Sequence, residues 1–188
     1  MNVLLSEDTQ EISDNIIHKI LLPYRKKNAL YLKKAKMINL EEKENGILSI
    51  VGDFEINDSC YVDSTGHFNA VELIICFNQL AYVLFGYAFS HNLFKYFPIK
   101  NGTTEAKEIL TLMTLDNYLD EQLSAMFILK SEQSFQAVIN PNSFQCFLQV
   151  VQIFYRNKIF FIKTRSTFSD DGNGKAKSKI TLAYVVRR

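Results

Sequence analysis

Apolar residues dominate one internal stretch of the chain, GHFNAVELIICFNQLAYVLF, which spans residues 66–85. On a helical wheel, the apolar side chains of Val71–Phe85 point in almost every direction, and only a narrow sector with Glu72 and Gln79 is polar. A helix that is apolar nearly all round is buried rather than laid on a surface. The pattern therefore predicts a buried helix, with one amide, Asn78, on its apolar side.

Strand-like runs lie on both sides of this segment. Two runs between Ala35 and Ile56 flank Glu42–Gly46, a polar stretch that ends in Asn-Gly and predicts a hairpin turn. Near the C-terminus, SFQCFLQVVQIFY, KIFFIKTRSTF and KSKITLAYVV are rich in aromatic and β-branched residues. Arg156-Asn157 and residues 170–174 separate these three runs, so they predict an antiparallel meander.

Helices are expected at two further places. Residues 7–22 carry isoleucine and leucine at helical spacing, and Pro23 is expected to end that helix. Thr114 is the expected N-cap of a short helix through LDNYLDEQ, ahead of a strand through MFILK. Residues 92–113 show no clear period, so loop with some helix is expected there.

A sheet curled around one long helix is the economical way to combine these elements. The sequence therefore predicts an α+β hot-dog fold. Its 188 residues are expected to form a single domain, 1–188, with an N-terminal helical extension over about 1–34. A chain of this length buries about 70% of its unfolded surface.

Charge and cysteine content exclude several classes of function. Lys and Arg number 21 against 20 Asp and Glu, so no net charge indicates nucleic-acid binding. A basic patch, residues 25–27 and 33–36, is interpreted as a solvated face or as a docking site for an anionic partner. Three cysteines without CxxC spacing and three scattered histidines favour neither a disulfide framework nor a metal site.

Two features bear on location. The N-terminus lacks the basic region and the long apolar region of a signal peptide. Polar residues interrupt the longest apolar runs before they reach the roughly 20 residues that a membrane span needs. We therefore expect a cytoplasmic protein without a membrane span.

The start of the predicted central helix carries candidate chemistry. Gly66 permits a close approach of the backbone to a ligand, and Asn69 is a good N-cap residue. Free N–H groups and the positive dipole end at such a position stabilise a developing oxyanion, which suits a thioester carbonyl. A buried amide is costly unless its hydrogen bonds are made, so Asn78 either bonds a neighbouring backbone group or serves such a carbonyl.

Three segments give the chain a family resemblance: Cys60–Asp63, Gly66–Glu72 and Cys76–Leu80, supported more weakly by 114–123 and 139–144. They resemble the FcoT-like hot-dog enzymes, which act on fatty acyl thioesters. The resemblance implies a homodimer or a higher oligomer, up to a hexamer. It also implies an acyl chain carried by the phosphopantetheine of an acyl carrier protein or of coenzyme A, with no separate cofactor.

The same resemblance implies the residues of a site. Its polar members match Tyr61, Asn69 and Asn78, and a further tyrosine matches Tyr24 or Tyr31, of which Tyr24 is favoured. The motif also makes Gly66 and Phe68 candidate substrate-binding residues, with His67 and Glu72 as candidate catalytic groups.

Two reactions are associated with this family. One is hydrolysis of long-chain fatty acyl-CoA, and the other adds glycine to C3 of a (2E)-enoyl thioester in isonitrile lipopeptide biosynthesis. Hydrolysis needs an activated water or a carboxylate nucleophile, but the helix start offers Asn69 where many hot-dog thioesterases use Asp or Glu. Amide and phenol donors suit an enolate, and His67 is suited to accept the ammonium proton. Addition is therefore the expected reaction, hydrolysis is the alternative, and non-catalytic acyl binding is the second alternative.

Simpler structural roles stay open for three of these residues. His67 can cap the helix or bond a backbone carbonyl. Glu72 can be a solvated or interface residue rather than a base or a group that positions water. Tyr61 can be a half-buried packing residue. Cys76 is expected to be a small apolar core residue, because no basic partner lies within helical reach.

Overall fold

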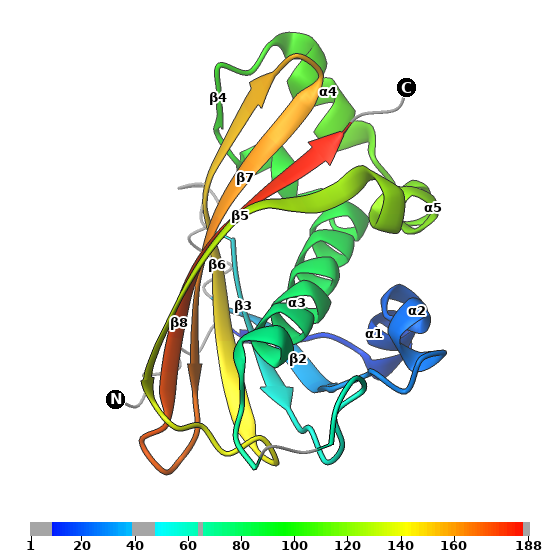
Figure 1. Ribbon diagram of the computed structural model, residues 1–188. Helices are drawn as coiled ribbons and strands as arrows, with labels where there is room; N and C mark the ends of the chain where they lie inside the picture. The colour runs from blue at the N-terminus through cyan, green and yellow to red at the C-terminus, as the bar shows by residue number, and fades with distance from the viewer. Residues whose placement is uncertain (1–8, 39–47, 64–65, 186–188) are drawn as a thin grey trace.

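The computed structural model describes residues 9–38, 48–63 and 66–185. Within them, an eight-stranded sheet curls around one long helix, α3 (Ala70–Ser90), as Figure 1 shows. The predicted hot-dog fold and its buried central helix are confirmed, and the helix is longer than the predicted 71–85.

The strands are β1 (Thr9–Glu11), β2 (Leu32–Ile38), β3 (Leu48–Phe54), β4 (Ile99–Lys100), β5 (Met126–Ala137), β6 (Phe144–Arg156), β7 (Ile159–Ser169) and β8 (Lys175–Val185). The other helices are α1 (Asp14–Ile20), α2 (Leu22–Arg25), the 3₁₀ helix η2 (Leu93–Tyr96), α4 (Thr104–Leu112) and α5 (Leu115–Ala125). The sheet order is β1-β2-β3-β6-β7-β8-β5 with antiparallel neighbours, and β4 pairs in parallel with β6. β5 therefore forms one edge of the sheet.

The C-terminal meander is confirmed, since β6, β7 and β8 pair as consecutive antiparallel strands. Asn157 and Lys158 connect the first two strands with φ angles of 52° and 61°. Two consecutive positive φ angles are typical of the tight turns whose twist matches that of paired strands. β2 and β3 also pair as predicted, although the hairpin turn expected at Glu42–Gly46 lies outside the described residues.

α3 is the core helix. By length and composition alone it is apolar enough to cross a membrane, but 72% of its most apolar 18-residue window is buried inside the protein. Its polar sector does not face solvent, because Glu72 is 4% exposed and Gln79 is fully buried. The least covered face of α3 is apolar instead, and Val71 on it is 49% exposed.

The N-terminal prediction was wrong in two respects. A single helix over 7–22 does not form, because Thr9–Glu11 pair with β2 and the N–H of Ile12 bonds the carbonyl of Ala35, so that α1 begins only at Asp14. Pro23 does not end the helical segment either. It lies in the first turn of α2, where its missing N–H leaves no hydrogen bond unmade.

The segment before β5 folds largely as expected. Residues 92–113 hold η2, β4 and α4 with connecting loops. Thr114 is confirmed as the N-cap of α5, since its hydroxyl accepts the N–H of Asn117 at 3.2 Å. α5 continues to Ala125 and leads directly into β5.

Candidate active site

Asn69 caps the N-terminus of α3. Its Oδ1 accepts the backbone N–H groups of Val71 at 2.9 Å and Glu72 at 3.2 Å. In return, Oε2 of Glu72 accepts the N–H of Asn69 at 3.1 Å, which completes a capping box. The Glu72 carboxylate is therefore a buried part of the helix cap and is not a solvated residue.

Tyr61 approaches the same cap from the preceding loop. Its hydroxyl donates a hydrogen bond of 2.8 Å to Oδ1 of Asn69, and the tyrosine is 46% exposed. Oδ1 thus accepts three donors, which fixes the orientation of the amide. The Nδ2 group can only donate, so it is the part of this amide that could bond a carbonyl oxygen of a ligand.

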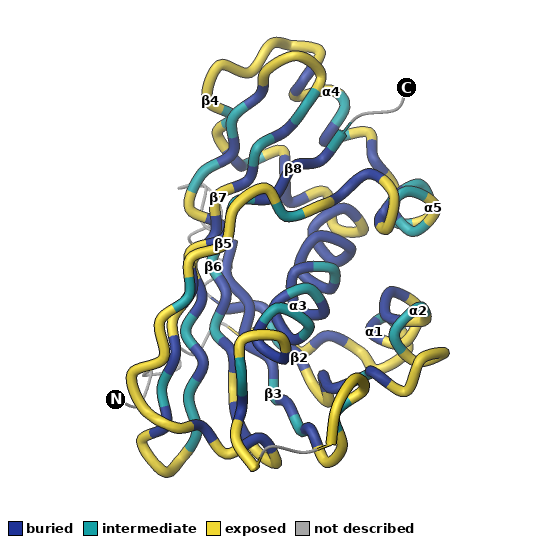
Figure 2. Tube along the Cα trace, viewed as in Figure 1, coloured by how far each residue is buried: buried dark blue, intermediate teal, exposed yellow. Residues whose placement is uncertain are grey.

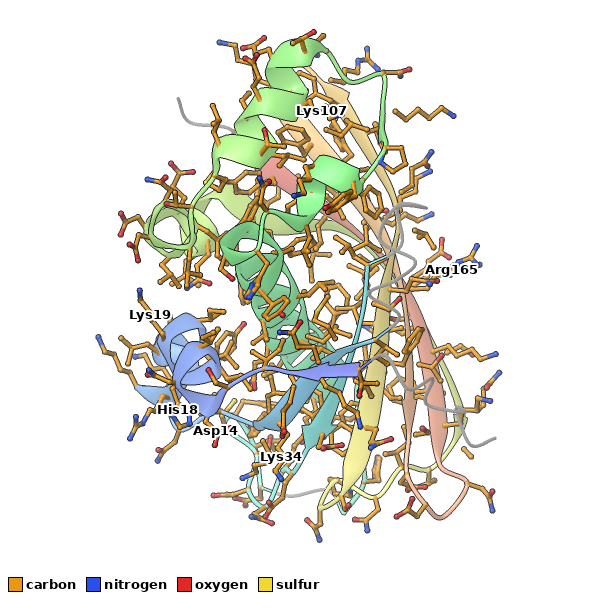
Figure 3. All side chains as sticks on the ribbon, turned by 180° about the vertical axis from the view of Figure 1, so that it is seen from behind. Asp14, His18, Lys19, Lys34, Lys107 and Arg165 are labelled. Atoms are coloured by element: carbon orange, nitrogen blue, oxygen red, sulfur yellow. The ribbon has the colours of Figure 1, made fainter. Side chains whose placement is uncertain are left out.

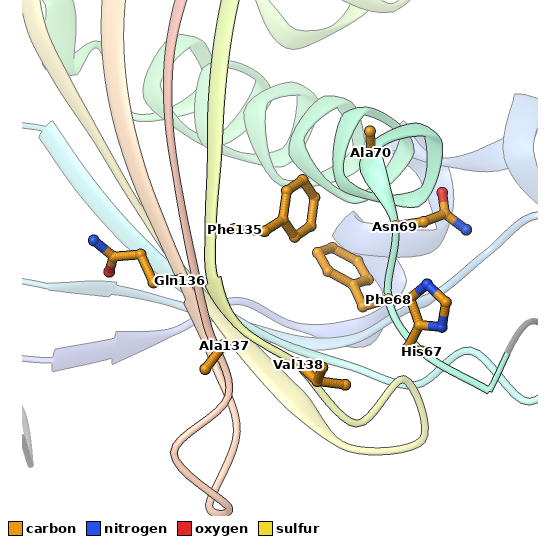
Figure 4. Close-up of a pocket in the computed structure, with 8 residues that line it drawn as sticks. All are labelled: His67, Phe68, Asn69, Ala70, Phe135, Gln136, Ala137 and Val138. Atoms are coloured by element: carbon orange, nitrogen blue, oxygen red, sulfur yellow. The ribbon is translucent and has the colours of Figure 1, made fainter.

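A cavity of about 470 Å³ lies beside this cap, between the start of α3 and the end of β5. Its lining residues are His67, Phe68, Asn69, Ala70, Phe135, Gln136, Ala137 and Val138. Figure 4 shows Phe68 turned toward Phe135, while His67 and Asn69 point away from them. The cavity therefore has one aromatic wall and one polar wall.

Phe68 and Gly66 have different structural roles beside this cavity. The Phe68 ring is buried, with ring centroids 4.6 Å from Phe144 and 5.3 Å from Phe168. Gly66 has a φ of +73°, which favours glycine, and an added Cβ would meet nothing within 4 Å. This backbone conformation is by itself a reason for glycine at position 66. His67 is exposed at the cavity.

Asn78 belongs to a second polar pair. Its side chain lies close enough to the Tyr24 hydroxyl to act on the pKa of that phenol, and the Tyr24 ring centroid lies 6.2 Å from that of Tyr82. Burial, followed by the neighbouring Tyr82, raises the pKa of Tyr24 well above its usual value. The Tyr24 hydroxyl therefore stays protonated and is able to donate.

A smaller cavity of about 150 Å³ lies next to Asn78. Its other lining residues are Ala81, Tyr82, Met126, Phe127, Ile128 and Leu182. Both cavities thus lie between α3 and β5, the larger at the end of β5 and the smaller at its beginning.

The two polar pairs do not meet within one chain. Asn78 lies eight residues beyond Ala70, which at about 1.5 Å per residue is roughly 12 Å along the helix axis. Tyr61 is hydrogen-bonded to Asn69, and the Tyr24 phenol lies beside Asn78. The expected convergence of Tyr61, Asn69 and Asn78 on one pocket is absent from a single protomer.

Tyr31 has a different position from Tyr24. Its hydroxyl accepts the backbone N–H of Cys60 at 2.7 Å, and burial is the main cause that raises the pKa of its phenol. Because Cys60 directly precedes Tyr61, this bond holds the loop that brings Tyr61 to Asn69.

Gln79 is the residue that sequence reasoning missed. Its Oε1 accepts the N–H groups of Tyr31 at 3.0 Å and Leu32 at 2.9 Å, and its Nε2 donates to the carbonyl of Ala29 at 2.7 Å. All three partners lie far away in sequence, so the only signal was an amide in an apolar helix. Of the amide pair in α3, Gln79 therefore fastens the N-terminal segment and Asn78 faces a cavity.

The cysteines contribute no reactive group to either cavity. Cys76 is fully buried, as expected for a core residue, and burial raises the pKa of its thiol well above the usual value. Among the described residues, no group of three His, Cys, Asp or Glu side chains is placed to hold a metal ion.

The fold and the helix-start site define a hot-dog enzyme of the thioesterase type. The model of the FcoT-like thioesterase domain matches residues 19–184, and the chain belongs to this family. A (2E)-enoyl-[ACP] glycyltransferase of Mycobacterium tuberculosis is 35% identical over 190 residues, which is 97% of this chain and 92% of that protein.

Two further proteins extend the comparison. The (2E)-enoyl-[ACP] glycyltransferase of Mycobacterium marinum is 36% identical over 185 residues, covering 96% of this chain and 90% of the relative. A thioesterase of Pseudomonas aeruginosa, known from its crystal structure, aligns with a TM-score of 0.44 and 9% identity. That alignment covers 94% of this chain and 96% of the other.

Proposed function

We propose that this chain is a (2E)-enoyl-acyl carrier protein glycyltransferase, which adds glycine to C3 of an enoyl thioester. The main support is the amide of Asn69 at the helix start, where many hot-dog thioesterases use an Asp or Glu carboxylate. The nearest carboxylate, Glu72, is buried and bonded to the cap. No Asp or Glu of the described residues lines either cavity.

The helix start is suited to polarise the thioester carbonyl. Nδ2 of Asn69 would donate to the carbonyl oxygen, and the dipole of α3 would add a favourable potential there. The glycine nitrogen then forms a bond to C3, and the C2–C3 π electrons move toward the carbonyl to give an enolate. A proton leaves the nitrogen and another is added at C2, so the balance requires no oxidant or reductant.

His67 is the proposed base for glycine. It is exposed and lines the same cavity as Asn69, and a neutral imidazole nitrogen can accept a proton as a general base. The acyl chain would lie along the opposite wall, against Phe68 and Phe135. The phosphopantetheine arm of the substrate would then be the only cofactor-like group involved, and the proposed location of the reaction is the cytoplasm.

A second copy of the chain would complete the site. β5 is an edge strand, and Figure 2 shows that most of it is exposed. Next to it lies the open apolar face of α3 around Val71. If two copies pack with their α3 helices antiparallel, Tyr24 and Asn78 of one copy approach Tyr61 and Asn69 of the other. This homodimer, alone or within a higher oligomer, would unite the two polar pairs.

The proposal is tested by the glycine dependence of enoyl consumption. A (2E)-enoyl thioester should lose its conjugated ultraviolet absorbance only when glycine is present, and the thiol should stay esterified. Release of free thiol from enoyl and saturated thioesters alike, without glycine, would favour the hydrolase instead.

A further inference from the structure

Three exposed cations follow Tyr24 in a loop that starts at the last residue of α2, Arg25, and continues through Lys27. Both ends of this loop lie against α3. At one end the Tyr24 hydroxyl lies beside Asn78, and at the other the carbonyl of Ala29 accepts a hydrogen bond of 2.7 Å from Nε2 of Gln79. The cations therefore stand directly beside the second polar pair.

The loop is a closed turn. The N–H of Asn28 bonds the carbonyl of Arg25 at 3.2 Å, and the N–H of Ala29 bonds the carbonyl of Tyr24 at 3.1 Å. Asn28 itself has a left-handed φ of 52°, which asparagine tolerates well. Arg25–Lys27 are thus presented from an ordered backbone.

The cations of the basic patch differ in whether an acidic residue lies next to them. Its other lysines each have an acidic neighbour: Lys33 pairs with Glu55 at 3.4 Å, Lys34 lies across from Asp53, and Lys36 lies across from Glu11. Arg25–Lys27 form no ion pair with any carboxylate in the described part of the chain. Among the described residues, Arg25–Lys27 are thus the part of the patch that has neither an ion-pair partner nor an acidic residue opposite it on a neighbouring strand.

We propose that Arg25–Lys27 dock the acidic surface of the carrier protein that delivers the enoyl thioester, an inference that rests on the proposed function. Like charges clustered beside a site steer an oppositely charged partner and fix its orientation. A single phosphate would need converging donors, but these three exposed side chains line neither of the two cavities. Their spread along a turn fits a broad anionic protein surface.

The test compares two charge-reversed proteins. The loop variant carries Arg25→Glu, Lys26→Glu and Lys27→Glu. The matched control carries Lys163→Glu, Arg165→Glu and Lys177→Glu on the outer face of the sheet, where all three are exposed. In Figure 3, Arg165 lies on the opposite side of the molecule from α1 and its Lys19.

The probe is a type II acyl carrier protein loaded with a (2E)-dodecenoyl chain, together with the same enoyl group on coenzyme A and on pantetheine. With the carrier substrate, KM of the loop variant should rise about tenfold more than it rises with pantetheine, because the charges act on encounter. The control variant should show no such difference, and added salt should raise the wild-type KM for the carrier.

Three results would overturn the docking surface. An equal rise in KM with pantetheine would place the effect at the Tyr24 site. Equal rises with coenzyme A and the carrier would indicate phosphate recognition. No rise at all would mean that the loop does not dock the carrier.

Direct binding of the loaded carrier, measured by fluorescence anisotropy, requires no turnover and therefore tests docking separately from the reaction. Salt-sensitive binding without any adduct would contradict the reaction while leaving the docking surface supported.

Discussion

The hydroxyl of Tyr61 lies 2.8 Å from Oδ1 of Asn69, the atom that also caps α3. This one oxygen therefore caps α3 and also orients the Asn69 amide, whose Nδ2 group is the proposed donor. Because Tyr61 and two backbone N–H groups all use Oδ1, the Asn69 amide has a single orientation that satisfies them, with Nδ2 turned outward.

Asn69→Asp should separate the two roles of this residue. Aspartate caps a helix as well as asparagine does and is favoured by the dipole, so the melting temperature should be retained or raised. The substitution replaces a donor by a negative charge where an oxyanion develops. Adduct formation should therefore fall by about a hundredfold or more, measured as kcat with an enoyl thioester and glycine.

Asn69→Ala is the matched control for this experiment. It removes the cap as well as the donor, so it should also lower the free energy of unfolding by about 1 kcal/mol. An Asn69→Asp enzyme that forms adduct at the wild-type rate would contradict the assigned donor. A gain of hydrolysis in Asn69→Asp would agree with the carboxylate that thioesterases use.

The neighbours Asn78 and Gln79 should respond oppositely to truncation. Asn78→Ala should lower turnover by roughly tenfold to a thousandfold with little change in melting temperature, because Asn78 faces a cavity. Gln79→Ala leaves three buried backbone groups without a partner. It should lower the free energy of unfolding by about 3 kcal/mol or more, measured in urea. A large stability loss in Asn78→Ala, with activity falling only through unfolding, would assign Asn78 to the core.

The fold was predicted well from the sequence because the spacing of apolar residues along each segment indicates which of its faces is buried. The all-round apolar helix required a sheet to cover it, and the aromatic C-terminal runs supplied that sheet. Thr9–Glu11 were mispredicted because a short edge strand depends on pairing with β2, which no local pattern reveals.

The site was harder to predict than the fold. The cap residue Asn69 and its partner Tyr61 lie only eight residues apart, in two neighbouring segments that carry the family resemblance. Gln79 was grouped with Glu72 as a polar sector, yet its partners lie 47 to 50 residues away and become neighbours only in the folded chain. The separation of Asn78 from Asn69 along α3 follows from helix geometry, but the pairing of Asn78 with Tyr24 requires tertiary structure.

A charge on the open face of α3 should disrupt the proposed dimer. Val71→Glu places a carboxylate on a half-exposed position, so a monomer would tolerate it, while a dimer that buries this face would dissociate. Leu112→Glu on α4, where leucine is 70% exposed, is the control and should leave the assembly intact. Light scattering of both variants gives the comparison, and a monomeric wild type would contradict the two-copy site.

Mixing two inactive variants tests whether the site is shared. If Asn69 of one copy works with Asn78 of the other, a heterodimer of Asn69→Ala and Asn78→Ala chains contains one intact site. Refolding the two together should restore about a quarter of the wild-type activity. No recovery, despite demonstrated heterodimers, would show that each chain acts with its own residues.

Asp170 should make the free energy of unfolding depend on pH in the acidic range. Burial acts to raise the pKa of this carboxyl, but hydrogen bonds from the N–H groups of Asn140, Gly174 and Gly172 outweigh it and hold the pKa below its usual value. A lowered folded-state pKa stabilises the protein above the unfolded value of about 3.9, and the effect is lost as pH falls through the folded value.

Asp170→Asn should therefore lower the free energy of unfolding by about 1 kcal/mol at neutral pH, a small effect because solvent screens the carboxylate. The difference from wild type should shrink below about pH 4. Thermal unfolding across pH measures it, with the exposed neighbour Asp171→Asn as control. A difference that persists unchanged at low pH would contradict the role of the charge.

The most direct measurement of the proposed reaction is the mass of its product. The wild-type protein is incubated with a (2E)-enoyl thioester on an acyl carrier protein, with and without glycine, and with the saturated thioester as control. We expect a 3-(carboxymethylamino)acyl thioester, formed only from the enoyl substrate and only with glycine, with the acyl chain still on its carrier. Free fatty acid from both substrates, without any glycine adduct, would contradict it.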